Sequence, residues 1–237
     1  MGLSGQRVAI IGGSSGIGFA IAERAMAEGA EVVIGSSQQA KVDAACEQLG
    51  SKASGRAIDV HDEQSIADFF AATGEFDHLV FTAGDWGKRD PKEIVDVEAD
   101  EFANTIAVRF TGALLAVKHA RPHLRDGGSV VLTDGIVAHR PRKGAPLNTA
   151  MAGAVEHLVY GLAVDLAPLR VNGVCPGAIG TEVWGENAAA AFKGFTDTLP
   201  LPRLGTPQEV AEAYLFLMKC GYVTGQIVRV DGGKSLI

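Results

Sequence analysis

Three glycines near the start of the chain could hold a phosphate group. Gly12, Gly16 and Gly18 follow the apolar run 8–11 and precede a helical pattern that reaches Glu28. Glycine keeps such a turn tight and lets backbone N–H groups approach a ligand. The N-terminus of the next helix adds unpaired N–H donors and the positive end of its dipole. We therefore expect a pyrophosphate to contact Gly12, Ser14, Ser15, Gly16, Ile17 and Gly18.

Composition limits the class of protein. The chain has 237 residues, of which 47% are hydrophobic and 21% charged, and these values suit one large α/β domain. A net charge of −7 argues against nucleic acid as a partner. The sequence shows no signal peptide and no apolar run long enough for a bilayer, so we expect a cytoplasmic protein that binds no membrane. Neither the cysteines nor the histidines have ligand spacing, so the sequence predicts no metal site; they include Cys46, Cys175, Cys220, His61, His78, His119 and His123.

Strand patterns alternate with helix patterns almost to the end of the chain. Short apolar runs predict strands at residues 8–11, 31–35, 55–60, 77–81, 129–133, 170–175 and 226–230. Amphipathic patterns predict helices that follow the glycine turn and that span 38–49, 63–72, 99–124, 149–166 and 207–219. Repeated strand–helix units imply a parallel sheet with helices on both faces, within a single domain 1–237.

Motifs spread along the chain resemble those of the short-chain dehydrogenase/reductase family. Besides the glycine turn they are Asp59-Val60, Ala83-Gly84, Arg170-Val171-Asn172, Cys175 to Thr181, Arg203 to Pro207, Tyr222 to Gly225 and Val230 to Gly233. The resemblance implies a Rossmann fold, with a doubly wound sheet of seven parallel strands and helices on both faces. It also implies a nicotinamide cofactor across the carboxyl ends of the strands.

The resemblance assigns cofactor contacts to further residues. Asp59 matches the carboxylate beside the adenine amino group, with Val60 as its apolar neighbour, although Asp59 could instead cap the end of a strand. Ala83 and Gly84 match the small residues that lie close to the ribose. The segment that holds the nicotinamide amide corresponds to Pro176, Gly177, Ile179 and Thr181.

The end of the second predicted strand bears on the choice of cofactor. NAD-dependent members usually place Asp or Glu there, whereas this chain has Ser36 and Ser37. Both hydroxyls could bind the 2′-phosphate of NADP, or they could cap the following helix. With no carboxylate to repel that phosphate, we expect NADP as the cofactor, with NAD possible.

The family's catalytic residues are replaced. The family uses a Tyr as proton donor, a Lys four residues later that lowers the pKa of that Tyr, and a Ser and an Asn as supporting groups. Alignment places Asn148 at the Tyr, Ala152 at the Lys, Gly135 at the Ser and Arg109 at the Asn. No Tyr-x-x-x-Lys occurs in the chain.

Two functions are compatible with this replacement. In the first, the protein is an NAD(P)-dependent carbonyl (or imine) reductase with a nonstandard site. There Arg109 would polarise a substrate oxygen, Asp134 would pair with Arg109 or carry a proton, and Asn148 would donate a hydrogen bond. Such a site would best serve a small-molecule substrate that is already cationic or activated. In the second, the protein binds a nucleotide without hydride transfer and acts through a partner.

Two segments could border the substrate. Residues 182–199 match the family's substrate lid, and the aromatic rings of Trp184, Phe192 and Phe195 could cover a substrate or simply pack on the sheet. The loop 139–144 contains His139 and three further basic residues, and it could attract an anionic substrate or form a solvated surface loop.

The helices 101–124 and 149–166 resemble those that form the family's dimer contact, so we expect a homodimer or a homotetramer. Small residues in the second helix would allow close helix approach: Ala150, Ala152, Gly153 and Ala154. The C-terminal residues 234–237 could join a second interface.

Overall fold

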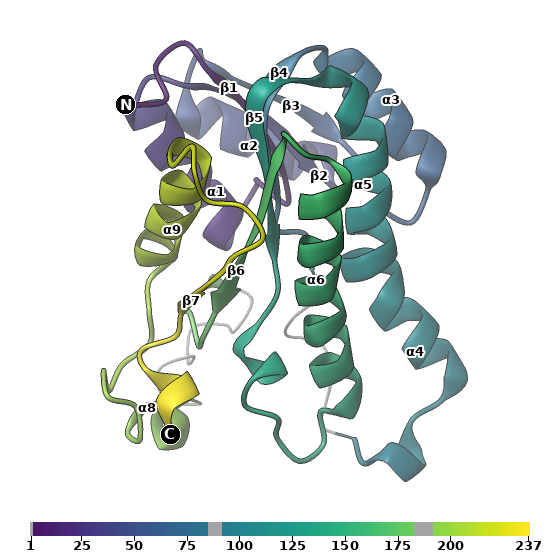
Figure 1. Cartoon of the computed structure of the whole chain (residues 1–237), viewed down its shortest axis with the longest axis vertical. Coiled ribbons are helices and arrows are strands. Elements are labelled where there is room, and N and C mark those ends of the chain that lie inside the picture. Colours follow the sequence, from purple (N-terminus) through teal and green to yellow (C-terminus); the bar gives the residue numbers. More distant parts are fainter. Residues whose placement is uncertain (1, 85–91, 183–191) are drawn as a thin grey trace.

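The computed structural model of the chain describes residues 2–84, 92–182 and 192–237. One seven-stranded sheet lies at its centre, with every neighbouring pair parallel (Figure 1). The strand order is β3 (Ala53–Ala57), β2 (Glu31–Ser36), β1 (Arg7–Ile11), β4 (Phe76–Phe81), β5 (Leu124–Thr133), β6 (Arg170–Pro176) and β7 (Ile227–Val230). This arrangement confirms the predicted doubly wound Rossmann fold.

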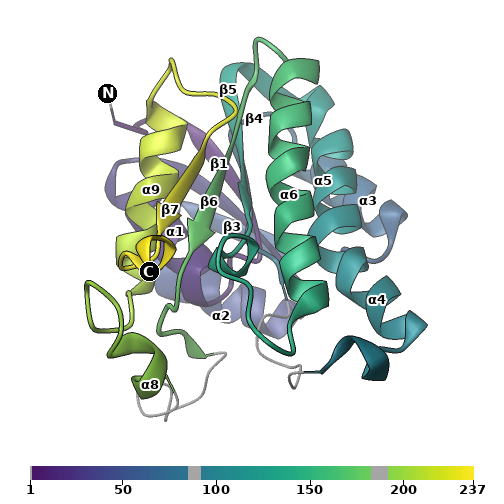
Figure 2. The ribbon, with the colours of Figure 1, turned by 60° about the horizontal axis from the view of Figure 1, so that its bottom comes forward.

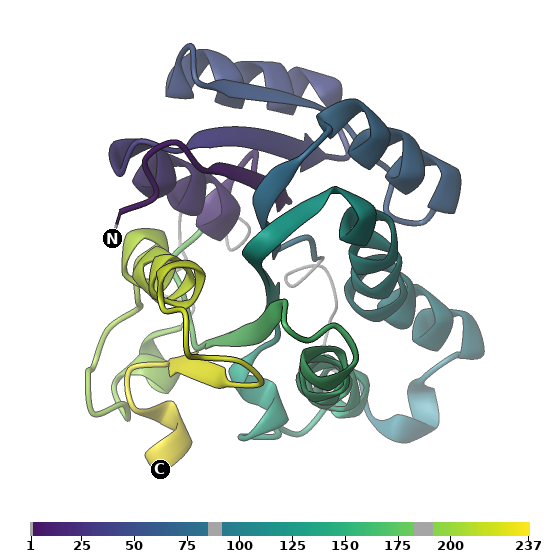
Figure 3. The same ribbon diagram turned by 45° about the horizontal axis from the view of Figure 1, so that its top comes forward.

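Helices cover both faces of the sheet (Figure 3). One face packs against α1 (Gly16–Ala27), α2 (Gln39–Leu49) and α9 (Pro207–Lys219). The other packs against α3 (Glu63–Thr73), α5 (Ala113–Ala120) and α6 (Pro146–Asp165). The other helices in the described ranges are α4 (Ala99–Ile106), α8 (Lys193–Thr196), the π-helix η2 (Ala107–Gly112) and the 3₁₀ helices η1 (Ile94–Asp96), η3 (Arg121–His123), η4 (Ile136–Ala138) and η6 (Lys234–Leu236). None of the helices in the described ranges is long and apolar enough to cross a membrane.

Apolar side chains point alternately to the two faces of the central strands, and they form one hydrophobic core on each face. Ile10 belongs to the core under α1 and α9, and its neighbour Ile11 belongs to the core under α3 and α5. Successive side chains of a strand point to opposite faces, and a parallel sheet covered on both faces buries both sets. The continuous apolar runs read from the sequence are therefore explained by this double burial.

Several predicted bounds differ from the structure; for example, β5 begins at Leu124 rather than at residue 129, and α6 begins at Pro146 rather than at residue 149. The third strand ends at Ala57 rather than at residue 60, because its partner β2 ends at Ser36, which pairs with Ala57. The single helix predicted over 99–124 is divided by the π-helix η2, and it ends in η3, where Pro122 precedes the start of β5 at Leu124.

Two buried residues of the Arg-Val-Asn motif hold β6 in place against β7 and α9. Arg170 donates hydrogen bonds of 2.5–3.0 Å to three carbonyl oxygens at the end of α9. The Asn172 amide donates to the carbonyl of residue 223 and accepts from the N–H of residue 226. These bonds satisfy the carbonyls that a helix end leaves unpaired, and they hold β6 and β7 in register.

A buried histidine of β4 pairs with a serine of the neighbouring strand β5. His78 is only 1% exposed, and its Nδ1 and Nε2 lie 2.9 Å and 3.1 Å from the Ser129 hydroxyl and the Gln6 amide oxygen. Because that oxygen can only accept, Nε2 donates and Nδ1 accepts, as in a neutral ring. Burial lowers the pKa of His78 to about 4.

We predict a pH-dependent loss of stability from this residue. The unfolded chain protonates His78 near its ordinary pKa of 6.5, whereas the folded protein does so only near 4. The unfolded state therefore binds more protons in this window, and the free energy of unfolding falls by up to about 3 kcal/mol as the pH drops through it. Urea denaturation between pH 7 and pH 4 should show a shallower pH slope for His78→Asn. The exposed His61→Asn should keep the wild-type slope, and an unchanged slope in His78→Asn would contradict the prediction.

Candidate active site

The glycine turn brings α1 against the end of β1 at a distance that side chains would prevent. A Cβ atom at Gly18 would overlap the carbonyl oxygen of Gly12, and one at Gly12 would lie 2.7 Å from the amide nitrogen of Ala83. Gly12 also has a φ of +91°. The helix N-cap is Ser15, whose side chain makes no capping hydrogen bond, and the first turn contains no acidic residue. The turn thus fits the phosphates of a dinucleotide.

The segment that follows β6 reaches across to this turn. The side chain of Thr181 lies 3.4 Å from where a Cβ of Gly16 would be. Gly177 passes so close to β7 that its Cβ would lie 2.7 Å from the Asp231 Cα. Gly180 and Gly205 anchor the segment, because the Gly180 N–H donates to the Gly205 carbonyl at 2.9 Å. The segment predicted to hold the nicotinamide therefore lies at the same sheet edge as the glycine turn.

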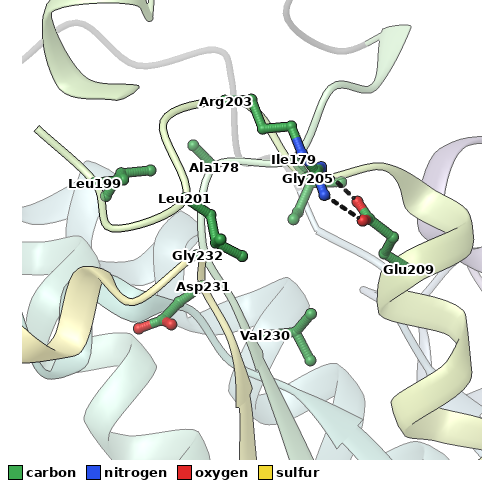
Figure 4. Close-up of a pocket in the computed structure, with 10 residues that line it drawn as sticks. All are labelled: Ala178, Ile179, Leu199, Leu201, Arg203, Gly205, Glu209, Val230, Asp231 and Gly232. Carbon is green, nitrogen blue, oxygen red and sulfur yellow. Dashed lines mark hydrogen bonds and ion pairs between the residues drawn. The ribbon is translucent and has the colours of Figure 1, made fainter. Parts of the chain in front are cut away.

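A small pocket lies beneath this segment (Figure 4). The Arg203 guanidinium forms two hydrogen bonds of 2.8 Å and 2.6 Å with the Glu209 carboxylate on one side of it, and Ile179, Leu199 and Leu201 supply apolar walls. Its volume of about 100 Å³ is well below the ~300 Å³ of the smallest usual ligand pockets. We regard it as a packing gap beneath the segment that follows β6, and not as a ligand site.

The two serines at the end of β2 do not cap the next helix. The N-cap of α2 is Gln38, and it makes no side-chain capping bond. The capping interpretation of Ser36 and Ser37 is therefore wrong. The Ser14 hydroxyl instead donates to the Ser36 hydroxyl at 2.8 Å, which joins the end of β2 to the glycine turn.

Asp59 forms a local turn beyond the end of β3. Its carboxylate accepts a hydrogen bond of 2.9 Å from the His61 N–H, and its own N–H donates to the Ser65 hydroxyl. These bonds agree with the capping alternative for this exposed residue. The contacts of Asp59 and Val60 with adenine, and those of Ala83 and Gly84 with the ribose, stay predictions.

Arg109 lies in the π-helix η2, and it is only 4% exposed. The wide π-turn packs against α6, the helix that carries Asn148 and Ala152. Gly112 permits a further close approach, because a Cβ there would lie 3.1 Å from the Val60 carbonyl oxygen. The fold thus brings the turn that contains a buried arginine against the helix that carries Asn148 and Ala152.

A stripe along α6 connects these positions to a deeper cluster. Asn148, Ala152 and Glu156 are spaced four residues apart, so they share one face of the helix. Asn148 is half-buried, whereas Ala152 and Glu156 are 1% and 6% exposed. Within the part of the chain that the structure describes, the Asn148 amide makes no hydrogen bond. Because Ala152 faces inward, it cannot contribute to a helix contact between subunits, as the sequence had suggested.

Four side chains meet at the inner end of this stripe. One ligating atom each of Asp134, His139, Glu156 and Cys175 lies within 4.8 Å of the others. His139 Nε2 and Glu156 Oε1 are 2.6 Å apart. Sequence reasoning missed Glu156, although its carboxylate is an isolated charge in the apolar middle of a helical pattern.

Asp134 has an unusual environment in this cluster. It is 1% exposed, and neither carboxylate oxygen has a hydrogen-bond partner, so the expected pairing with Arg109 is not formed. Burial, and then the nearby Glu156, raise the pKa of Asp134 well above its usual range. Burial likewise raises the pKa of the Cys175 thiol. Neither neighbour satisfies the Asp134 carboxyl with a well-formed hydrogen bond.

The basic loop makes contacts within the chain. Besides the contact of His139 with Glu156, Arg140 donates to the carbonyls of Lys234 and Ser235, and Lys143 forms an ion pair with an exposed glutamate. These contacts favour a structural role for the loop. An open groove of about 590 Å³ lies between this loop and the start of α6, lined in part by Arg142. Attraction of an anionic substrate there stays a prediction.

The described part of the lid segment packs on itself and on the C-terminus. The rings of Phe192 and Phe195 meet edge to face, and the Lys234 ammonium lies 4.9 Å from the centre of the Phe195 ring. Figure 2 shows α8 beside the C-terminal end. Trp184 lies outside the described residues, so the substrate-covering role of this segment stays a prediction.

Known proteins resemble the chain over almost its whole length. A family model described as enoyl-(acyl carrier protein) reductase matches residues 11–235. The short-chain dehydrogenase/reductase ucsE of an Acremonium species is 36% identical over 252 residues, which cover 97% of this chain and 95% of the relative.

Two solved structures share the fold. The crystal structure of a small-chain dehydrogenase in complex with NADPH has a TM-score of 0.84 and 33% identity, and the alignment covers 98% of this chain and 99% of that one. The MalC reductase/Diels-Alderase of Malbranchea aurantiaca has a TM-score of 0.91 and 32% identity, with 99% and 98% covered. The sheet order, the glycine turn and these similarities together show that the chain belongs to the short-chain dehydrogenase/reductase family.

Proposed function

We propose that the protein is an NADP-dependent reductase of carbonyl or imine compounds with a nonstandard active site. The observation that carries this proposal is the pairing of a glycine turn fit for a dinucleotide with a buried arginine where the family has its asparagine. Bound NADP(H) would supply the hydride-transfer chemistry itself. The protein's own residues then have to bind the cofactor, orient the substrate and stabilise developing charge.

The glycine turn and Ser15 would bind the pyrophosphate, and Ser36 and Ser37 would face the 2′-phosphate. This assignment is supported by the lack of any carboxylate in β2 after Glu31 and by the bond between Ser14 and Ser36. The similar small-chain dehydrogenase was crystallised with NADPH. Binding by NAD is compatible with the same turn.

Arg109 would stabilise negative charge on a substrate oxygen. A guanidinium stays charged at any physiological pH, so it cannot supply a proton. Preorganised positive charge in a dry site lowers the barrier by opposing the charge that develops on the oxygen. The Asn148 amide, half-buried and without a hydrogen bond in the described structure, would add a neutral donor.

Loss of the tyrosine restricts the substrate class. Neither Asn148 nor Ala152 can deliver a proton, and Asp134 contacts the deeper cluster, so we assign it no proton transfer. A carbonyl polarised by Arg109 can take its proton from water after hydride arrival, and an imine that is already protonated needs none. Activated carbonyls and imines are therefore the substrates that this site would serve best.

The alternative of a nucleotide-binding protein without hydride transfer gains no support from the comparisons. The relative and the two solved structures are all named as dehydrogenases or reductases.

Arg109 gives the proposal its main test. We expect NADPH consumption with some member of a panel of activated ketones, aldehydes and imines, followed by absorbance. For a carbonyl substrate, Arg109→Met should lower kcat/KM by about 100-fold, because it removes the charge that opposes the developing oxyanion. Arg109→Lys should retain part of the activity.

NADPH fluorescence titration is the control, because a variant that binds cofactor normally has kept its fold. Robust activity in Arg109→Met would contradict the assigned role. Normal cofactor binding with no turnover across the panel would favour the protein without hydride transfer.

The serine at the end of β2 tests the cofactor preference. We expect Ser36→Asp to weaken NADPH binding by about tenfold or more, because a carboxylate would repel the 2′-phosphate, and to spare NADH binding. Ser36→Asn introduces a side chain of the same size as that of aspartate but without its charge. It should leave the ratio of the NADPH and NADH dissociation constants nearly unchanged. Equal loss of both cofactors in Ser36→Asp would refute this assignment.

We also propose that the protein forms a homodimer or homotetramer through α5 and α6. Val164, Tyr160 and Leu114 are exposed on these helices by 81%, 42% and 38%. Gly153 and Gly161 leave open space on α6, which would allow another helix to approach closely.

Light scattering after size exclusion should give the mass of an oligomer, and Val164→Glu should reduce that mass, because a carboxylate would be buried at the interface. Val95→Glu is the matched control, since Val95 is equally exposed but lies in η1. A wild-type monomer, or loss of the oligomer in Val95→Glu alone, would exclude this interface.

A further inference from the structure

Four potential metal ligands converge where β5, η4, α6 and β6 meet. Asp134 directly follows β5, His139 follows η4, Glu156 lies in the middle of α6, and Cys175 lies near the end of β6. One ligand atom from each is within 4.8 Å of all the others. Segments up to 41 positions apart in sequence thus present an imidazole, a thiol and two carboxylates to one point.

One member of the cluster is a deeply buried carboxylate that no hydrogen-bond donor reaches. Both oxygens of Asp134 are buried, and neither has a hydrogen bond. Buried carboxylates are normally paired with a charge, hydrogen-bonded or bound to a metal. The groups nearest to it are the Glu156 carboxyl and the Cys175 thiol. Two carboxyl groups side by side in a buried site are stable only when they share a proton or a cation. A bound cation would therefore satisfy the Asp134 carboxylate.

We propose that Asp134, His139, Glu156 and Cys175 bind one Zn²⁺ ion. The donor set selects this class of metal, because a thiolate and an imidazole are ligands of zinc, whereas magnesium and calcium prefer oxygen ligands alone. This proposal departs from the prediction of no metal, which considered only spacing along the sequence. It concerns a site separate from the proposed hydride transfer and does not depend on it.

The number of ligands indicates a structural role. Four protein ligands complete a tetrahedral zinc site and leave no position for water or substrate. Metal–ligand distances of about 2.0–2.3 Å require ligand atoms to lie about 3.3–3.8 Å apart. His139 Nε2 and Glu156 Oε1 are now 2.6 Å apart and would have to separate by about 0.7 Å on zinc binding, whereas ligand atoms as far apart as 4.8 Å would have to approach. The His139 side chain is 24% exposed and gives the ion a path of entry.

The charges at the cluster indicate that Arg229 must move when zinc binds. Asp134, Glu156 and a Cys175 thiolate carry three negative charges, so the zinc-bound cluster would have a net charge of −1. Arg229 Nη2 lies 3.3 Å from His139 Nδ1. If zinc binds Nε2, the ring proton is on Nδ1, and Arg229 cannot donate to it. This exposed arginine must then turn toward solvent, and it opposes metal binding in its present position.

Cobalt spectroscopy of the whole chain provides the test, and it needs neither substrate nor cofactor. Chelator-treated protein is titrated with Co²⁺ and then with Zn²⁺. We expect one Co²⁺ per chain, a thiolate-to-cobalt charge-transfer band, visible bands typical of four-coordinate cobalt, and displacement by Zn²⁺. Cys175→Ser should abolish the charge-transfer band, and Asp134→Asn should weaken Zn²⁺ binding by about 100-fold.

Two further variants are controls, one for a damaged fold and one for metal binding elsewhere on the protein. Arg229→Gln should strengthen Zn²⁺ binding by about tenfold, because it removes a cation beside the ligand, and a damaged fold could not produce this gain. Cys46→Ser removes a thiol from α2, on the other face of the sheet, and should leave the cobalt spectrum unchanged. A chain that binds no Co²⁺, or a charge-transfer band that persists in Cys175→Ser, would overturn the proposal.

Discussion

The contact of the α1 backbone with the glycine turn determines where every other part of the site can lie. A side chain at Gly18 would collide with the Gly12 carbonyl, and one at Gly12 would collide with the first residues after β4. Only this approach lets the ends of β1 and β4 and the start of α1 meet at one point. In a parallel sheet all strands end at the same edge, so loops from distant parts of the chain reach this point as well. Thr181, which follows β6, is one of them.

The same edge carries the positions that the resemblance aligns with the family's catalytic residues, and the fold does not depend on them. Asn148, Ala152 and Gly135 lie on α6 and just after β5, and the hydrophobic core that holds these two elements is formed by other residues of the same elements. Arg109 occupies a π-turn, a local widening of the helix that is frequent at functional sites. The sheet therefore constrains the positions, and the residue types at them determine the chemistry.

Local signals predicted the features that depend on neighbouring residues. The glycine turn, the alternation of strands and helices and the bounds of α9 could be read from the sequence, because spacing and turn chemistry determine them. The end of β3 could not, because it depends on where its partner β2 ends. The cluster around Glu156 could not either, since its members come from four segments that only the fold unites. A single buried carboxylate in an apolar helix was the one available signal.

The end of β5 contributes to two sites, because Asp134 and Gly135 are neighbours in the sequence but face different sides. Successive residues of an extended chain point to opposite sides, so Asp134 contacts the cluster with Cys175 and Glu156, while Gly135 faces the other side, where we predict the family's serine position. Glu156 is likewise one helical turn beyond Ala152 on the same face of α6. A cation bound by the cluster would thus tie the end of β5 to α6 directly behind the residues proposed to face the substrate. In this arrangement a structural ion would hold the spacing between the end of β5, next to Gly135, and the face of α6 that carries Asn148.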